Sequence, residues 1–131
     1  MTIFSKIIAG EIPSYKIAED DYFYAFLDIA PLVKGHVLVI PKVEVDKVFD
    51  LDDTYLSRML VFAKPIAHAL EKTMNCKRCG LSVVGLEVPH AHLHLLPINE
   101  MDDTNFTRGK LQLAETEMQE IQQTITSALK S

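Results

Sequence analysis

The stretch Val88-Pro89-His90-Ala91-His92-Leu93-His94-Leu95-Leu96-Pro97 (VPHAHLHLLP, residues 88–97) carries the strongest signal for both fold and function. Because alternate side chains of a β-strand point to the same face, His90, His92 and His94 are predicted to line one face of a strand. The apolar residues between them can then pack on a core. A strand rises ~3.3 Å per residue, so neighbouring histidines lie roughly 6.5 to 7 Å apart along it, and their rings touch only if they tilt.

Three imidazoles on one face are suited to chemistry at neutral pH. The ordinary pKa of histidine is close to physiological pH, so the three side chains can act as nucleophile, acid and hydrogen-bond donor around one ligand. Two alternatives remain open at this point. The histidines can lie on the surface without a shared role, or they can bind a catalytic zinc, which takes three protein ligands and a water molecule.

Helix and strand patterns surround this stretch and predict one domain. Gly and Pro residues bound short apolar or aromatic runs, which is typical of strands, whereas longer runs have apolar residues at helical spacing. Five strands are expected, over Tyr15–Ala18, Tyr22–Asp28, Gly35–Pro41, Gly80–Gly85 and His90–Pro97. Three helices are expected, over Phe4–Gly10, from Asp52 or Asp53 to about Thr73, and over Ala114–Lys130.

This order predicts an α+β domain over residues 1–131, with an antiparallel sheet of about five strands, a long helix packed on it and a C-terminal helix. The apolar stripe of the long helix contains Met59, Ile66 and Leu70. Pro65 lies inside that helix, where proline removes a hydrogen bond, so we expect a kink or a split there. Residues 98–131 are predicted to form an irregular arm, Asn99–Gln112, followed by the last helix.

Composition excludes several classes of protein. The formal net charge of −5 leaves no broad basic face for a nucleic-acid polymer. No apolar run approaches the ~18 residues of a membrane span, and the N-terminus lacks the apolar core of a signal peptide, so we expect a cytoplasmic protein without a membrane partner. Cys76 and Cys79 form a Cys-x-x-Cys pair, but no second pair completes a four-ligand zinc site.

The chain resembles the histidine-triad (HIT) superfamily, specifically its Hint-like nucleotide-binding branch. The resemblance covers Ile3 to Pro97 and rests on several stretches in the family's order. These are Ile3–Pro13, Glu19–Asp21 followed by Ala25–Pro31, Gly35–Lys42 and Val88–His94. The resemblance implies a HIT-like fold, a nucleotide ligand, no cofactor, no catalytic metal and a homodimer paired through the long helix.

The resemblance also implies a role for individual residues. His92 matches the nucleophile that attacks the α-phosphorus of a nucleoside phosphoramidate or (di)nucleotide and forms a nucleotidyl-histidine intermediate. His90 and His94 match residues that bind phosphate oxygens and assist proton transfer, and His36 matches a supporting histidine. Asp28 matches the carboxylate that receives the ribose hydroxyls, although an Asp before Pro31 can also simply form a turn. The apolar slot for the base matches Phe4, Ile7, Ile17, Phe26, Leu27 and Ile29, although these apolar residues can equally be core. The backbone N–H of Val88 is a further candidate donor to the phosphate.

The chain departs from the family pattern at several positions. The loop before the triad, Leu81–Glu87, is short, and Leu86 stands where the family has a glutamine. This loss of side-chain donors keeps open the alternative of a nucleotide-binding module with weak or lost catalysis. Thr2 and Ser5 occupy the region where many relatives carry zinc-binding cysteines, so no structural zinc is expected. In the arm, Phe106 and Arg108 are candidates for tuning substrate choice.

Overall fold

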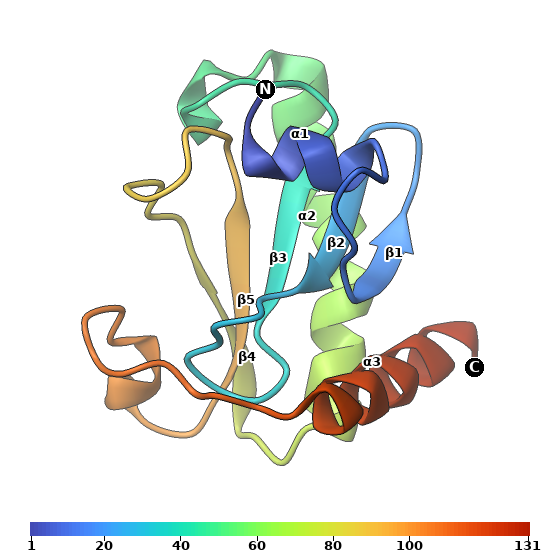
Figure 1. Ribbon diagram of the computed structural model, residues 1–131, viewed down its shortest axis with the longest axis vertical. Helices are drawn as coiled ribbons and strands as arrows, with labels where there is room; N and C mark the ends of the chain where they lie inside the picture. The colour runs from blue at the N-terminus through green and yellow to red at the C-terminus, as the bar shows by residue number, and fades with distance from the viewer.

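A five-stranded antiparallel sheet forms the centre of the computed structural model, which describes residues 1–131 (Figure 1). The spatial order of the strands is β1-β2-β3-β5-β4, and every neighbouring pair is antiparallel. The predicted fold class is therefore confirmed. The strands are β1 Lys16–Glu19, β2 Phe23–Leu27, β3 Val37–Pro41, β4 Arg78–Ser82 and β5 Leu93–Ile98.

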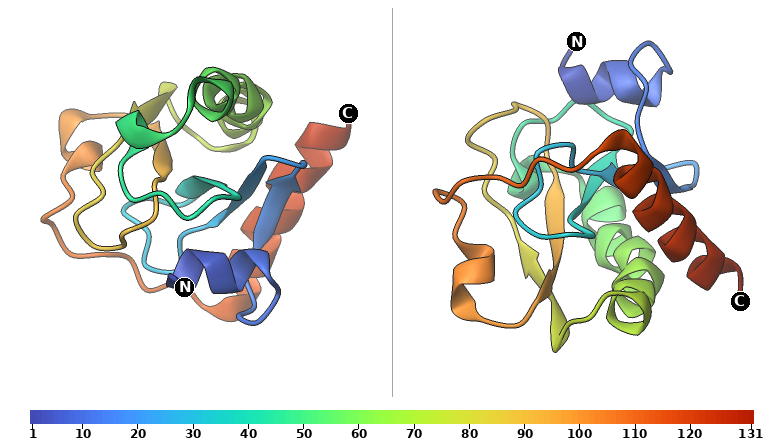
Figure 2. Two further views of the ribbon diagram at one scale, coloured as in Figure 1. Left: turned by 90° about the horizontal axis from the view of Figure 1, so that it is seen from above. Right: turned by 60° about the horizontal axis from the view of Figure 1, so that its bottom comes forward.

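Helices cover both faces of the sheet (Figure 2). The long helix α2 and the C-terminal helix α3 share one core with one face, whereas the short α1 packs on the other face. None of the helices is long and apolar enough to cross a membrane. The helices are α1 Ile3–Ile8, α2 Asp53–Thr73 and α3 Glu115–Lys130, with short 3-10 helices η1 Val48–Asp50 and η2 Met101–Thr104.

Both α1 and α2 begin at a residue whose side chain caps the helix. The Asp52 carboxylate accepts a hydrogen bond from the Tyr55 N–H at 3.0 Å, and the Thr2 hydroxyl accepts one from the Ser5 N–H at 3.0 Å. Such caps satisfy backbone donors that have no partner within the helix. The expected split at Pro65 is wrong, because α2 continues from Asp53 to Thr73. Packing of buried side chains on both sides of the proline holds the helix together.

The strand boundaries near the triad differ from the predicted ones. β5 pairs with β3 only from Leu93 onward, so His90 and His92 precede the regular ladder. The Ala91 N–H instead donates to the carbonyl of Val45, in the loop after β3, at 2.7 Å. β4 also begins and ends earlier than predicted, so residues 83–87 form a loop. The alternation of the two faces nevertheless continues through residues 90–95.

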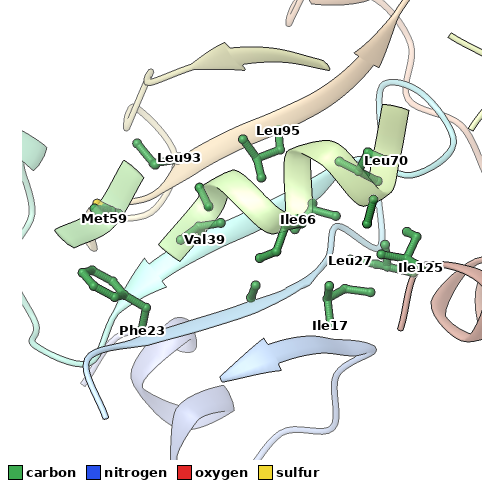
Figure 3. Packing of buried hydrophobic residues seen from close by; sticks show 14 of the residues in the cluster. Ile17, Phe23, Leu27, Val39, Met59, Ile66, Leu70, Leu93, Leu95 and Ile125 are labelled. Atoms are coloured by element: carbon green, nitrogen blue, oxygen red, sulfur yellow. The ribbon is translucent and has the colours of Figure 1, made fainter. Parts of the chain in front are cut away.

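The sheet separates two apolar cores of different size. The larger core lies between the sheet and helices α2 and α3, where Leu93 and Leu95 face Ile66 and Leu70 (Figure 3). Full burial of one such side chain is worth about 1.5–3 kcal/mol. The smaller core lies under α1. The histidines point to the α1 side, because they alternate along the chain with Ala91 and the two leucines, which belong to the larger core.

Candidate functional site

The structure gathers four histidines on the α1 side of the sheet. His36 comes from the residue before β3, and the other three come from residues 90–94. All four are at most 8% exposed. The rings of His92 and His94 are in T-shaped contact, with their centroids 4.9 Å apart, and His94 lies 5.2 Å from His36. The rings therefore tilt toward one another and lie closer than the strand rise alone provides.

Hydrogen-bond partners fix the proton on His92. Its Nδ1 lies 2.7 Å from the backbone carbonyl of His90, and a carbonyl can only accept, so Nδ1 carries the proton. The Nε2 atom of a neutral His92 then has a free lone pair. Every fully buried side-chain nitrogen and oxygen of the protein has a partner. The unpaired Nε2 therefore faces open space, as a nucleophile must.

A relay of hydrogen bonds fixes the protons on His36 and His94. The Leu32 N–H donates to His36 Nδ1 at 3.1 Å, so the His36 proton lies on Nε2. His36 Nε2 in turn donates to His94 Nδ1 at 2.9 Å. A neutral His94 consequently carries its own proton on Nε2, which has no protein partner. His94 thus offers a hydrogen-bond donor beside the open nitrogen of His92.

Burial keeps this relay neutral. Loss of solvent, helped by the neighbouring histidines, lowers the pKa of His36 to about 3 and that of His94 to about 4. Burial acts in the opposite direction on Asp28 and raises the pKa of its carboxyl. Asp28 Oδ1 accepts the Ala30 N–H at 2.9 Å, and Oδ2 lies 3.8 Å from His36 Nε2. Oδ2 has no hydrogen-bond donor within the protein.

His90 differs from the other members of the triad because the protein uses both of its ring nitrogens. Nε2 lies 2.9 Å from the carbonyl of Pro41 and must donate to it. Nδ1 therefore accepts from the Thr2 hydroxyl at 2.8 Å. The expected role of His90 as a phosphate ligand does not fit this arrangement, since no ring nitrogen remains free. The side chain instead joins the start of α1 to β3.

The predicted base slot is present only in part. Phe4, Ile7, Phe26 and Val88 belong to the small core beside the histidines, and the Phe4 ring meets the edge of His92 with centroids 5.1 Å apart. Val88 also has a backbone N–H without a hydrogen bond. Ile12, which lies between α1 and β1, packs against the same core.

Three residues of the predicted slot lie elsewhere. Ile17 and Leu27 are buried in the larger core on the opposite face of the sheet. Leu27 follows Phe26 in β2, and consecutive residues of a strand cannot share a face, so only one of the two can line the slot. Ile29 is 76% exposed beside Asp28 and is not part of a formed pocket.

A cavity of about 390 Å³ opens over His92 and His94. Asp28 and His36 line its floor, the loop at Glu87 forms one side, and the C-terminal arm supplies Phe106 and Lys110. The Phe106 ring packs on His94 with centroids 4.7 Å apart. Arg108, the other arm residue expected to contribute, does not line the cavity. Lys110 could not be predicted from the sequence, because an irregular segment has no periodicity that could place it.

The same corner contains donor atoms that a metal could use. One ligand atom each from Asp28, His36 and His94 lies within 4.8 Å of the others. A metal bound there through these atoms would break the hydrogen bond between the two histidines, which already pairs both nitrogens. Cys76 and Cys79 form no disulfide, and burial raises the pKa of Cys79 to about 11, so its thiol is held in the unreactive form.

The fold and the site define an α+β domain whose sheet carries a cluster of buried histidines under a small N-terminal helix. A family model described as the HIT domain matches residues 9–101. The chain belongs to the HIT family. The predicted resemblance is thereby confirmed.

Relatives of known sequence and structure agree with this assignment. A HIT-like protein of Borreliella burgdorferi is 39% identical over 132 residues, which cover 95% of this chain and 95% of that protein. The adenosine 5′-monophosphoramidase HNT1 of Saccharomyces cerevisiae is 44% identical over 96 residues, 72% of this chain and 61% of the yeast protein. The crystal structure of a Hit-like protein of Bartonella henselae has a TM-score of 0.84 and 30% identity, and the match covers 97% of this chain and 95% of that one.

Proposed function

We propose that this protein is a nucleotide-binding hydrolase or transferase that acts at the α-phosphorus of nucleoside phosphoramidates or (di)nucleotides. The observation that carries the proposal is the free Nε2 of His92, whose Nδ1 proton is held by the His90 carbonyl at 2.7 Å. Its similarity to the yeast adenosine 5′-monophosphoramidase supports the same reaction class.

The reaction proceeds in two displacements at phosphorus. The Nε2 lone pair of His92 forms a bond to the α-phosphorus, the bond to the leaving nitrogen or oxygen breaks, and the leaving group takes a proton from water. The oxygen of that water then attacks the same phosphorus, and the bond to Nε2 breaks. His94 Nε2–H and the free Val88 N–H are the donors we assign to the phosphoryl oxygens.

Asp28 and the small core provide the features needed to hold a nucleoside. A carboxylate can accept two hydrogen bonds, and Oδ2 of Asp28 lacks a donor within the protein, so the two ribose hydroxyls complete its partners. The apolar surface formed by Phe4, Ile7 and Phe26 is our proposed contact for the base. Exposed Ile29 is positioned beside Asp28 in the sequence, where a bound nucleoside can cover it.

Turnover of adenosine 5′-phosphoramidate by the wild type and His92→Ala tests this proposal. We expect the substitution to abolish turnover while AMP binding persists. The control His68→Ala removes an exposed histidine of α2 and is expected to retain full activity. A nucleotidyl adduct on the wild type, mapped to His92 by mass spectrometry, would support the mechanism. AMP binding without turnover would favour a binding module that has lost catalysis.

We also propose that two copies of the chain associate. The predicted contact surface needs correction, since the apolar stripe of α2 at Met59, Ile66 and Leu70 packs on its own sheet. The outward surface instead combines Leu60, 56% exposed, with Leu81 of the edge strand β4, 51% exposed. An open edge strand pairs readily with a two-fold copy of itself. Sedimentation that shows only a 14.7 kDa species at micromolar concentration would contradict this proposal.

A further inference from the structure

The C-terminal arm is tied firmly to the site by contacts to the loop before β3. The Leu111 N–H donates to the Pro31 carbonyl at 2.8 Å, and Arg108 donates from its guanidinium to the Leu32 carbonyl at 2.6 Å. Arg108 also pairs with Asp102 at 3.0 Å. Leu32 is the same residue whose N–H fixes the proton position on His36. The arm is therefore a fixed wall of the cavity.

Lys110 lies between these two anchors, at positions 108 and 111, and lines the cavity over the histidines. Its ammonium group donates to the Phe106 carbonyl at 2.6 Å and contacts no carboxylate. All other charged groups that line the cavity are acidic, namely Asp28 and Glu87. The charges of Glu87 and Lys110 both act on the partly buried carboxyl of Asp28. Burial raises the pKa of Asp28, Glu87 raises it further and Lys110 lowers it.

We infer that Lys110 binds an anionic group on the leaving side of the substrate and so sets its specificity. This inference rests on the proposed function and identifies the leaving-group class. In the proposed reaction the leaving group departs into this cavity, where Phe106 packs on His94 and the Lys110 charge is close enough to lower the pKa of His94. Glu87 and Asp28 repel an anion in this cavity, and the ammonium group of Lys110 is the positive side chain that lines it. The anion is a carboxylate or a second phosphate.

Two pairs of compounds differ only by such an anion. The first pair is adenosine 5′-phosphoryl-alanine and its methyl ester, which differ by one carboxylate. The second pair is ADP and AMP, which differ by one phosphate. We would measure the affinity of each compound in the His92→Ala background, where no turnover interferes, and then add Lys110→Ala, Lys110→Glu or Lys110→Arg. Steady-state kcat/KM of the first pair with an intact His92 completes the experiment.

The ratio of affinities within a pair gives the result. Lys110→Ala should reduce the preference for the member with the additional anion about fivefold, as expected for one partly exposed charge pair, and change the affinity of the other member much less. Lys110→Glu should reverse the preference, Lys110→Arg should keep it, and higher salt should weaken it. Glu87→Gln should increase the preference. The responding pair identifies the anion as carboxylate or phosphate.

Lys72→Ala serves as the matched control, because Lys72 is exposed in the last turn of α2, a helix that packs on the other face of the sheet. Equal ratios in both pairs before and after Lys110→Ala would overturn the inference, as would equal losses of affinity for the two members of a pair. Failure of the proposed function gives a different result. In that case the wild type turns over neither the acid nor the ester, whereas the affinity ratios still report on Lys110.

Discussion

His90 and His94 flank His92 in the sequence, yet the structure gives them different surroundings. Both ring nitrogens of His90 form hydrogen bonds, one with Thr2 and one with Pro41, so His90 joins the start of α1 to β3. In His94 only Nδ1 has a partner within the protein, namely His36, and the Nε2–H is open to the cavity. Both rings carry their proton on Nε2. In His90 this proton bonds to a backbone carbonyl, whereas in His94 it is open to the cavity, where the proposed function assigns it to a phosphoryl oxygen.

The largest expected effect is loss of the open donor. His94→Ala should lower kcat about 10²- to 10³-fold, as removal of one preorganised oxyanion donor does in other enzymes. His90→Gln is the matched change on the structural side, since a glutamine amide can still donate to Pro41 and accept from Thr2. It should keep most of the activity. Similar losses of kcat in the two variants, measured with adenosine 5′-phosphoramidate, would remove the distinction between the two histidines.

Strand periodicity predicted much of the fold and the face of the histidines. The five strands, the three helices and the grouping of His36 with the triad follow from short-range patterns and the family resemblance. The alternation of side chains in β2 already excludes part of the predicted base slot, because the consecutive residues Phe26 and Leu27 cannot both line it. The proton positions on the histidine rings could not be predicted. They depend on Thr2, which is distant in sequence from His90, and on Leu32, which lies in the loop before His36. Lys110 reaches the cavity through an arm without periodicity.

The next largest effect is a loss of stability when the Thr2 hydroxyl, the partner of His90, is removed. Thr2→Val removes the cap of α1 and leaves the buried Nδ1 of His90 without a donor. We expect the free energy of unfolding to fall by about 1–3 kcal/mol, the typical cost of an unsatisfied buried group. Urea denaturation measures this change, and Thr2→Ser should restore most of it. A Thr2→Val protein of wild-type stability would show that His90 does not depend on this contact.

The smallest expected effect is a pH dependence of the free energy of unfolding that arises from His36 and His94. Burial lowers the pKa of His36 to about 3 and that of His94 to about 4, whereas an unfolded histidine titrates near 6.5. Between these values the unfolded chain binds more protons than the folded one, so stability falls as the pH falls below neutrality. From pH 7 to pH 6 each of the two histidines should reduce the free energy of unfolding by about 0.7 kcal/mol.

Other groups near this relay determine how the measurement is read. Burial also lowers the pKa of His90, which adds a loss in the same direction. Asp28 has the opposite effect on stability, because its raised pKa means that the folded state binds a proton more readily than the unfolded state. This effect belongs to the acidic pH range in which carboxyl groups titrate. Urea denaturation at pH 7 and pH 6 therefore isolates the histidines. His36→Asn should reduce the loss by about one histidine's share, about 0.7 kcal/mol. The exposed-histidine control His68→Gln should leave it unchanged, and equal losses in all three proteins would show that the buried relay is not what titrates.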